Sequence, residues 1–129
     1  MAKNPLKKLR KEADAKYQEV CMMKEGLCEV CKTRTAYCCH HLVAKSLSNR
    51  LRYEIKNGIR VCRGCHNLIH STADPAIFRK IEKAVGKKRM NWLEKTRREP
   101  VKINQQFYLE ALNKLNKWKK KEQLVQTPF

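Results

Sequence analysis

Two pairs of cysteines, each with two residues between its members, constrain the fold of this chain more than any other feature. Cys28 and Cys31 form the first pair, and Cys62 and Cys65 form the second. Two such pairs can supply four thiolates in a tetrahedral arrangement, which suits Zn²⁺ and leaves no coordination position open. A closed site of this kind is structural, and in small zinc modules metal binding supplies roughly 10–16 kcal/mol of apparent folding free energy. The spacing therefore predicts a structural zinc, with redox activity or chance pairing as the alternatives.

The other cysteines give no sign of a disulfide framework. The chain has 7 cysteines, an odd number, and no signal-peptide pattern precedes them, so paired cysteines are better explained as metal ligands in a reducing cytoplasm. Cys38 and Cys39 lie on a predicted strand, where cysteine often serves as a small buried apolar residue. The alternative that either of them replaces a ligand of the zinc stays open, and Cys21 is expected on a helix face.

The composition predicts one small domain with a thin core. The chain has 129 residues, a mean hydropathy of −0.72 and 33% charged residues. A core drawn from so polar a sequence is small, and a bound metal is a common supplement to such a core.

The charge predicts a polyanionic partner. Lysine and arginine number 30 against 12 acidic residues, for a formal net charge of +18 that is spread over the whole chain. Such a field favours nucleic acid or an anionic membrane. No apolar stretch is long enough to span a bilayer, and no clean basic amphipathic helix with an aromatic anchor stands out. We therefore expect DNA as the partner, no membrane association and a cytoplasmic location, the alternative being a basic protein that is merely soluble.

Apolar periodicity and turn signals predict helices at both ends of the chain and two short strands between them. Helices are expected over residues 5–24, from about residue 63 to residue 70, from the Asp74-Pro75 cap to residue 86, near residues 90–99, and over residues 104–123. The strands are expected just before His40 and over residues 59–61, with a turn at Asn57-Gly58. Helical spacing favours packing rather than base stacking for the aromatic residues Trp92, Phe107, Tyr108 and Trp118.

The histidines form the second chemical constellation. All 4 histidines of the chain lie between positions 40 and 70. His66 and His70 are four residues apart on a predicted helix, so both side chains lie on one face and can bind one ion. His40 and His41 arrive from a strand and are able to complete such a site. A single histidine is more often a structural residue, but four between two cysteine pairs in so basic a chain indicate a functional centre.

The cysteine pairs and the histidines together resemble the HNH endonuclease motif in its zinc-knuckle, ββα-metal (treble-clef) form. The segments that carry the resemblance are Cys28-x2-Cys31, His40-His41, Asn57-Gly58 and Cys62-x2-Cys65-His66-x3-His70. The resemblance is greatest to the small HNH proteins of phages and prophages, and the phage recombination proteins called NinG are a further candidate relative. The motif covers about a third of the chain. It implies a small α+β fold with a ββα-metal core over residues 28–72, an N-terminal helix within residues 1–27 that packs on this core, and a basic helical extension over residues 73–129.

The resemblance also implies a role for each site residue. It places a structural zinc on the four paired cysteines, Cys28, Cys31, Cys62 and Cys65, and a catalytic divalent ion on His40, His66 and His70. His41 matches the general base, a role that typically contributes about 10²–10⁴-fold in rate. Asn57 matches the residue that holds the loop and so orients this base. Four arginines near the motif are candidates for contacts with DNA phosphates: Arg50, Arg52, Arg60 and Arg63.

The expected activity is hydrolysis of DNA phosphodiester bonds with little sequence specificity, in a bacterial or phage-infected cytoplasm. Where many HNH enzymes offer oxygen ligands to the catalytic ion, this chain offers imidazoles, which suit Mn²⁺, Ni²⁺, Co²⁺ or Zn²⁺ as well as or better than Mg²⁺. The alternative is a non-catalytic, zinc-stabilised nucleic-acid-binding protein that assists phage recombination, replication or packaging. The sequence sets no oligomeric state.

Overall fold

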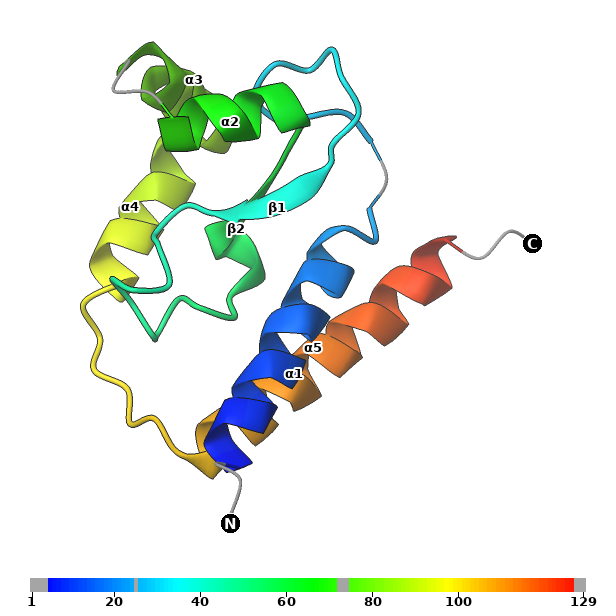
Figure 1. Ribbon diagram of the computed structural model, residues 1–129, viewed down its shortest axis with the longest axis vertical. Coiled ribbons are helices and arrows are strands. Elements are labelled where there is room, and N and C mark those ends of the chain that lie inside the picture. The colour runs from blue at the N-terminus through cyan, green and yellow to red at the C-terminus, as the bar shows by residue number, and fades with distance from the viewer. Residues whose placement is uncertain (1–4, 25, 72–74, 127–129) are drawn as a thin grey trace.

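The computed structural model describes residues 5–24, 26–71 and 75–126 and confirms a small α+β fold of five α-helices and a two-stranded antiparallel sheet within these ranges (Figure 1). In chain order the elements are α1 (Pro5–Cys21), β1 (Cys38–His41), the 3₁₀ helix η1 (Ile55–Asn57), β2 (Gly58–Val61), α2 (Arg63–Ser71), α3 (Pro75–Val85), α4 (Lys87–Thr96) and α5 (Gln105–Gln126).

The predicted elements are all present, and their ends differ by a few residues. Helix α1 ends at Cys21 rather than at residue 24, because the chain enters a turn that starts at Met22. Helix α5 continues to Gln126, past the predicted residue 123. The predicted cap Asp74 lies outside the described residues. No helix in the described part of the chain is both long and apolar enough to cross a bilayer.

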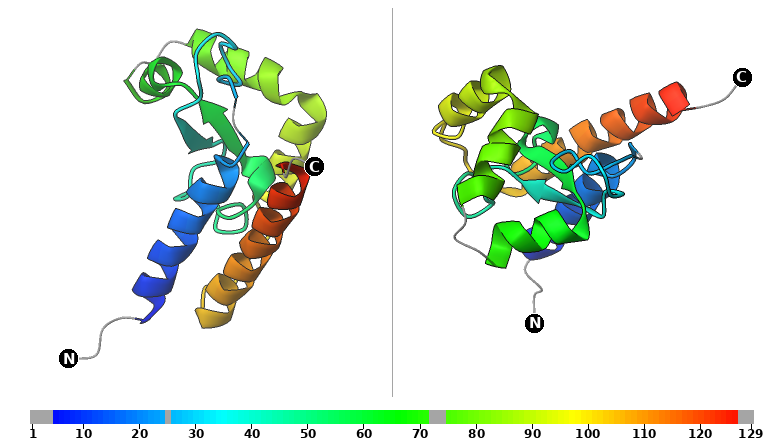
Figure 2. Two further views of the ribbon diagram at one scale, coloured as in Figure 1. Left: turned by 90° about the vertical axis from the view of Figure 1, so that its right-hand side faces the viewer. Right: turned by 90° about the horizontal axis from the view of Figure 1, so that it is seen from above.

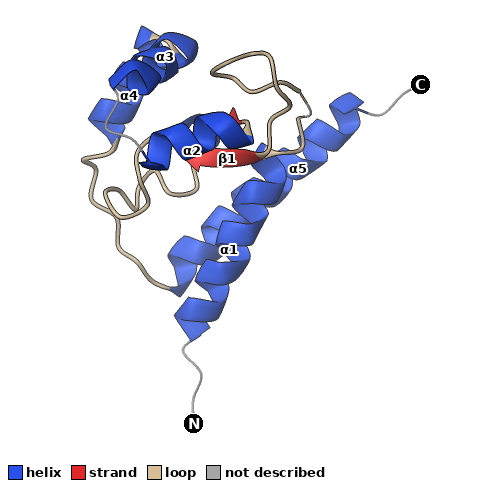
Figure 3. Cartoon of the chain, turned by 45° about the horizontal axis from the view of Figure 1, so that its top comes forward, coloured by secondary structure: helices blue, strands red, loops and turns tan. Residues whose placement is uncertain are grey.

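The two-stranded sheet presents two chemically different faces. Strands β1 and β2 pair in the register Cys38↔Val61, Cys39↔Arg60, His40↔Ile59 and His41↔Gly58. Successive side chains of a strand point to opposite faces. Cys38 and His40 therefore share one face, which α2 covers, and Cys39 and His41 share the other, against which α1 packs (Figure 3).

Beneath α2 and α3 lies the largest apolar cluster of buried residues. Ile59 and Val61 alternate along β2 and pack against Ile77 and Ile81, one helical turn apart on α3. The same cluster includes three of the four paired cysteines, Cys28, Cys62 and Cys65. The apolar core and the predicted zinc site are therefore one continuous structure.

On the opposite side, α1 and α5 lie next to each other and run in the same direction (Figure 2). Tyr17 and Val20 of α1 pack with Leu115 of α5 and with Cys39 of β1. Near the C-terminal end of α1, Lys119 Nζ of α5 lies 2.6 Å from a carboxylate oxygen of Glu19. This packing fixes the N-terminal helix against the sheet.

Gly58 is needed where β2 passes α1. A Cβ atom at this position would lie 2.5 Å from Cys39 Sγ, 2.7 Å from the Tyr17 hydroxyl and 3.2 Å from Cys21 Sγ. Gly58→Ala is therefore expected to lower the free energy of unfolding by about 1–3 kcal/mol, the typical cost of overpacking. Urea denaturation followed by circular dichroism measures this change.

The matched control is Gly64→Ala on α2. Its new Cβ would lie 3.4 Å from the flexible end of Arg34, its closest neighbour, and alanine favours the helix more than glycine does. Equal stability of Gly58→Ala and the unmodified chain would contradict the packing described here.

Candidate metal centres

A tight turn brings the first cysteine pair together. Lys32, the residue after Cys31, has a φ of 59°, in the left-handed region, and its backbone N–H donates to Cys28 O at 3.0 Å. Cys28 N donates in turn to Arg34 O at 2.7 Å, which closes a short hairpin. The two sulfur atoms are thereby directed to the same side of the hairpin, toward α2.

The second pair sits where β2 becomes α2. Cys62 follows the last residue of β2, and Cys65 lies in the first turn of α2. Cys65 N lies 3.4 Å from Cys62 Sγ, and His66 N donates to Cys62 O at 2.9 Å. The start of α2 thus holds this pair in place.

The structure brings the four paired cysteines into one cluster. Their sulfur atoms all lie within 4.8 Å of one another, and Cys31 Sγ is 3.8 Å from Cys62 Sγ. Four sulfur atoms on a tetrahedral zinc ion, each at about 2.3 Å from it, are about 3.8 Å apart. Cys28, Cys62 and Cys65 are buried, and Cys31 is half-buried. The cluster therefore fits a closed Zn²⁺ site, as the spacing predicts, and Cys38 and Cys39 lie outside it.

Electrostatics around the first pair favour thiolates. Hydrogen bonds from the side chain and the backbone of Thr33 lower the pKa of Cys31 to about 5. Burial opposes ionisation of Cys28, yet backbone N–H groups, including that of Cys31, hold its pKa below the usual value. Burial raises the pKa of Cys65, so a cation beside this thiol would favour its ionised form. A divalent ion among the four sulfur atoms would supply that cation.

Three of the four histidines form a second cluster. One ring nitrogen from each of His40, His66 and His70 lies within 4.8 Å of the other two. The Nε2 atoms of His66 and His70 are 3.1 Å apart. Two imidazole nitrogens that bind one ion at about 2.0–2.1 Å are about 3.0–3.4 Å apart, so this spacing fits a shared ion. The i,i+4 pair on α2 and the strand residue His40 converge as the sequence predicts, and we call these three residues the histidine triad.

The histidine triad is open to solvent, unlike the cysteine cluster. His70 is exposed, and His40 and His66 are half-buried. Burial and the nearby rings of His70 and His66 lower the pKa of His40 to about 4, and burial also lowers the pKa of His66. Both imidazoles are therefore neutral at pH 7, the form that binds metal. Three protein donors leave further coordination positions for water or substrate, as in catalytic rather than structural sites.

The fourth histidine, His41, does not join the triad. It lies on the other face of β1, where its ring stacks on that of Tyr17 with a centroid distance of 4.8 Å. Its Nε2 lies 2.9 Å from the backbone oxygen of Arg52. Because a carbonyl oxygen only accepts, Nε2 carries the hydrogen, and Nδ1 of the neutral ring is left to accept a proton. Burial lowers the pKa of His41, which favours this neutral form.

Asn57 holds the loop that supplies this carbonyl group. Its side chain is fully buried, donates to Val43 O at 3.0 Å and Leu51 O at 3.1 Å, and accepts from Val43 N at 2.8 Å. The backbone oxygen of Asn57 also accepts from Leu42 N at 2.7 Å. These bonds secure both ends of the segment between β1 and η1.

Helix α1 holds the same segment from outside, a contact that no local sequence pattern predicts. Asp14 accepts two hydrogen bonds from the Arg52 guanidinium group, at 3.0 and 2.8 Å, and one from the Tyr53 hydroxyl at 2.9 Å. The Tyr17 hydroxyl donates to Glu54 O at 2.8 Å. In the sequence, Asp14 and Tyr17 stand three residues apart on one predicted helix. This spacing places them on one side of the helix, but it does not indicate which distant loop they contact.

The four arginines predicted to contact phosphates differ in their surroundings. Arg50 pairs with Glu54 at 2.5 Å and with Glu99 at 3.3 Å. Arg52 is held by Asp14 as described above, and Arg60 pairs with Glu29 at 3.6 Å. Their contact with phosphates stays a prediction.

Arg63 is in a different position from the other three. Its guanidinium group lies 4.4 Å from the centroid of the Tyr37 ring, and this ring is 6.2 Å from that of His66. Among the described residues it has no carboxylate partner. Of the four arginines, Arg63 is therefore the one that this chain of ring contacts places near the histidine triad.

Comparisons of the chain with protein-family models, with curated proteins and with solved structures found no match in any of the three.

The cysteine cluster predicts that zinc is part of the folded protein. Cys62→Ser removes one of four thiolates and is expected to reduce the bound zinc severalfold and to abolish cooperative thermal unfolding, since metal binding supplies much of the folding free energy. Elemental analysis and circular dichroism measure the two effects.

Cys38→Ser is the control, because Cys38 is half-buried and lies outside the cluster. It should keep its zinc and its unfolding transition. Loss of zinc in Cys38→Ser, with zinc retained in Cys62→Ser, would contradict the assignment of ligands.

Proposed function

We propose that this protein is a metal-dependent endonuclease of the HNH type that hydrolyses DNA phosphodiester bonds with little sequence specificity. The observation that carries the proposal is the histidine triad: three imidazoles that converge within 4.8 Å and face solvent, on a chain with a net charge of +18. The order β1, β2, α2, with a four-cysteine cluster at the start of α2, is also what the ββα-metal, treble-clef architecture requires.

The histidine triad would hold a divalent ion such as Mn²⁺, Ni²⁺, Co²⁺, Zn²⁺ or Mg²⁺. When bound, such an ion supplies Lewis-acid stabilisation of the charge that develops on the phosphate and on the departing 3′ oxygen. His66 and His70 lie on α2, which begins at the cysteine cluster, so that cluster sets the position of the helix that carries them. Arg63, beside Tyr37, would bind a neighbouring phosphate.

His41 would take the proton from the attacking water. The hydrogen bond from Nε2 to Arg52 O leaves Nδ1 as the basic atom, and Asn57 keeps the loop that carries Arg52 in place. Asp14 and Tyr17 act further out as positioning residues, because they hold the same loop against α1. The products would carry 5′-phosphate and 3′-hydroxyl ends, as in-line attack by water implies.

One observation favours the alternative of a non-catalytic nucleic-acid-binding protein. His41 is on the face of β1 opposite His40, stacked on Tyr17. As the last residue of β1, it has to reach the substrate around the end of the strand. A protein that binds DNA without cutting it would need the zinc cluster and the basic surface but not His41.

The His41→Ala variant separates the two functions. We expect plasmid nicking to fall by about 10²–10⁴-fold, the usual contribution of a general base, with DNA binding and zinc content nearly unchanged. Gel assays of nicking and of DNA retention on the same preparations measure this.

Cys38→Ser, on the same strand, is the control and should cut like the unmodified protein. If the unmodified protein fails to cut plasmid with every divalent ion tested, the endonuclease proposal fails and the binding role is preferred. If His41→Ala cuts as fast as the unmodified protein, the assignment of His41 as the general base is wrong.

The donor set of the histidine triad predicts a metal preference. All three donors are imidazoles, and nitrogen ligands suit Mn²⁺, Ni²⁺ and Co²⁺ at least as well as Mg²⁺. Nicking rates across these ions should therefore be at least as high as with Mg²⁺. Activity with Mg²⁺ alone would count against metal binding by these three histidines.

A further inference from the structure

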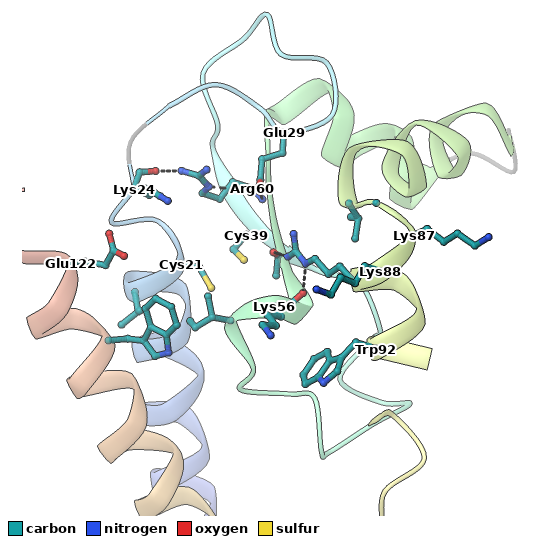
Figure 4. Close-up of a pocket in the computed structure, with 17 residues that line it drawn as sticks. Cys21, Lys24, Glu29, Cys39, Lys56, Arg60, Lys87, Lys88, Trp92 and Glu122 are labelled. Carbon is teal, nitrogen blue, oxygen red and sulfur yellow. Dashed lines mark hydrogen bonds and ion pairs between the residues drawn. The ribbon is translucent and has the colours of Figure 1, made fainter. Parts of the chain in front are cut away.

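A pocket separate from both metal centres lies on the other side of the molecule. It has a volume of about 660 Å³ and lies between the α1–α5 pair and the start of α4 (Figure 4). Cys39, Gly58 and Arg60, which share the sheet face opposite His40, form part of its lining. We call it the tryptophan pocket, because both tryptophans of the chain, Trp92 and Trp118, line it.

The two tryptophans bring flat aromatic surface to this pocket from different helices, Trp92 from α4 and Trp118 from α5. Trp118 is 40% exposed, so packing accounts for its position only in part. Trp92 is half-buried, and Lys56 Nζ lies 5.1 Å from the centroid of its ring. Trp118 therefore presents part of its ring to the pocket.

The lining is also strongly cationic. It includes six lysine and arginine side chains but only two carboxylates, those of Glu29 and Glu122. Arg89 is tied to the floor of the pocket, because it donates to Lys56 O at 2.7 Å and to Gly58 O at 2.6 Å. Arg60 pairs with Glu29 and donates to Lys24 O.

Two lysines, Lys24 and Lys88, remain to receive an anion. Within the part of the chain that the structure describes, Lys24, Lys87 and Lys88 line the pocket without an ion pair. Figure 4 shows Lys24 on the α1 side and Lys88 on the α4 side of the hollow, whereas the Lys87 side chain points away from it. The positive charge is thus placed on opposite sides of a pocket with aromatic and apolar walls.

We propose that the tryptophan pocket binds a nucleoside phosphate, either free or as a unit of a single strand. Flat aromatic side chains and unpaired cations that line one pocket match a ligand that has a planar base and a phosphate. The volume is within the range of small-ligand sites. Duplex DNA keeps its bases stacked inside, so it does not offer this combination. The proposal does not depend on cleavage at the histidine triad.

Intrinsic fluorescence tests the proposal directly, because the only two tryptophans of the chain both line the pocket. Thymidine monophosphate and a short oligothymidylate are titrated into the full-length protein, with thymidine alone and inorganic phosphate alone as partial ligands. We expect saturable quenching by the first two, and much weaker effects of the partial ligands. Tighter binding of the oligothymidylate than of the mononucleotide would identify a single strand as the source, and equal binding would identify the free nucleotide.

Variants then locate the site. Lys88→Ala should weaken binding by about five- to tenfold, since it removes one charge-assisted contact. Trp118→Leu should weaken it by about tenfold or more, with Trp92 still reporting, because one stacking surface is lost. Lys95→Ala is the matched control: Lys95 is exposed on the same helix, α4, but does not line the pocket.

Three results would overturn the proposal. The first is the absence of saturable quenching by either nucleotide. The second is an equal response to inorganic phosphate, which would mean an anion site without base recognition. The third is an equal loss of affinity in Lys88→Ala and Lys95→Ala, which would mean binding by overall charge. If the protein nicks plasmid but nucleotides do not quench its fluorescence, the endonuclease proposal stands and the nucleotide-site proposal fails. If nucleotides quench the fluorescence but the protein does not nick plasmid, only the nucleotide-site proposal stands.

Discussion

The convergence of four cysteine sulfurs is the interaction on which the rest of the structure depends. Cys28 and Cys31 come from a hairpin, and Cys62 and Cys65 come from the junction of β2 and α2. The four sulfur atoms lie within 4.8 Å of one another, and three of the four cysteines are buried in the main apolar cluster. Because four thiolates so close together repel one another, a bound cation is needed for all four to be ionised at once. Once that junction is fixed, α2 has one orientation over β1, and this orientation decides where its histidines lie.

The alternation of side chains along β1 then divides the chemistry between two faces. His40 meets His66 and His70 on the α2 face, whereas His41 stacks on Tyr17 on the α1 face. The tryptophan pocket uses the same second face further along the strands, beside Cys39 and Arg60. A four-residue strand thus separates a candidate metal centre from a candidate nucleotide site, which would let the protein contact nucleic acid on two sides.

The sequence predicted best the features that depend on short-range spacing. The cysteine pairs, the i,i+4 histidines, the two strands and the helix order all follow from local patterns, and the structure agrees with them. The sequence did not predict contacts between distant segments, such as the hydrogen-bonded ion pair between Asp14 and Arg52. Nor did it show that Trp118 faces a pocket, since helical periodicity identifies an apolar face without identifying what lies opposite.

If the cysteine cluster and the histidine triad are two distinct metal sites in one fold, anomalous diffraction from crystals grown with Mn²⁺ or Co²⁺ will show both. We expect one anomalous peak enclosed by the four sulfur atoms and a second bound by ring nitrogens of His40, His66 and His70, with water completing its coordination. A single peak at the sulfur atoms, with the three imidazoles turned away from one another, would contradict this expectation.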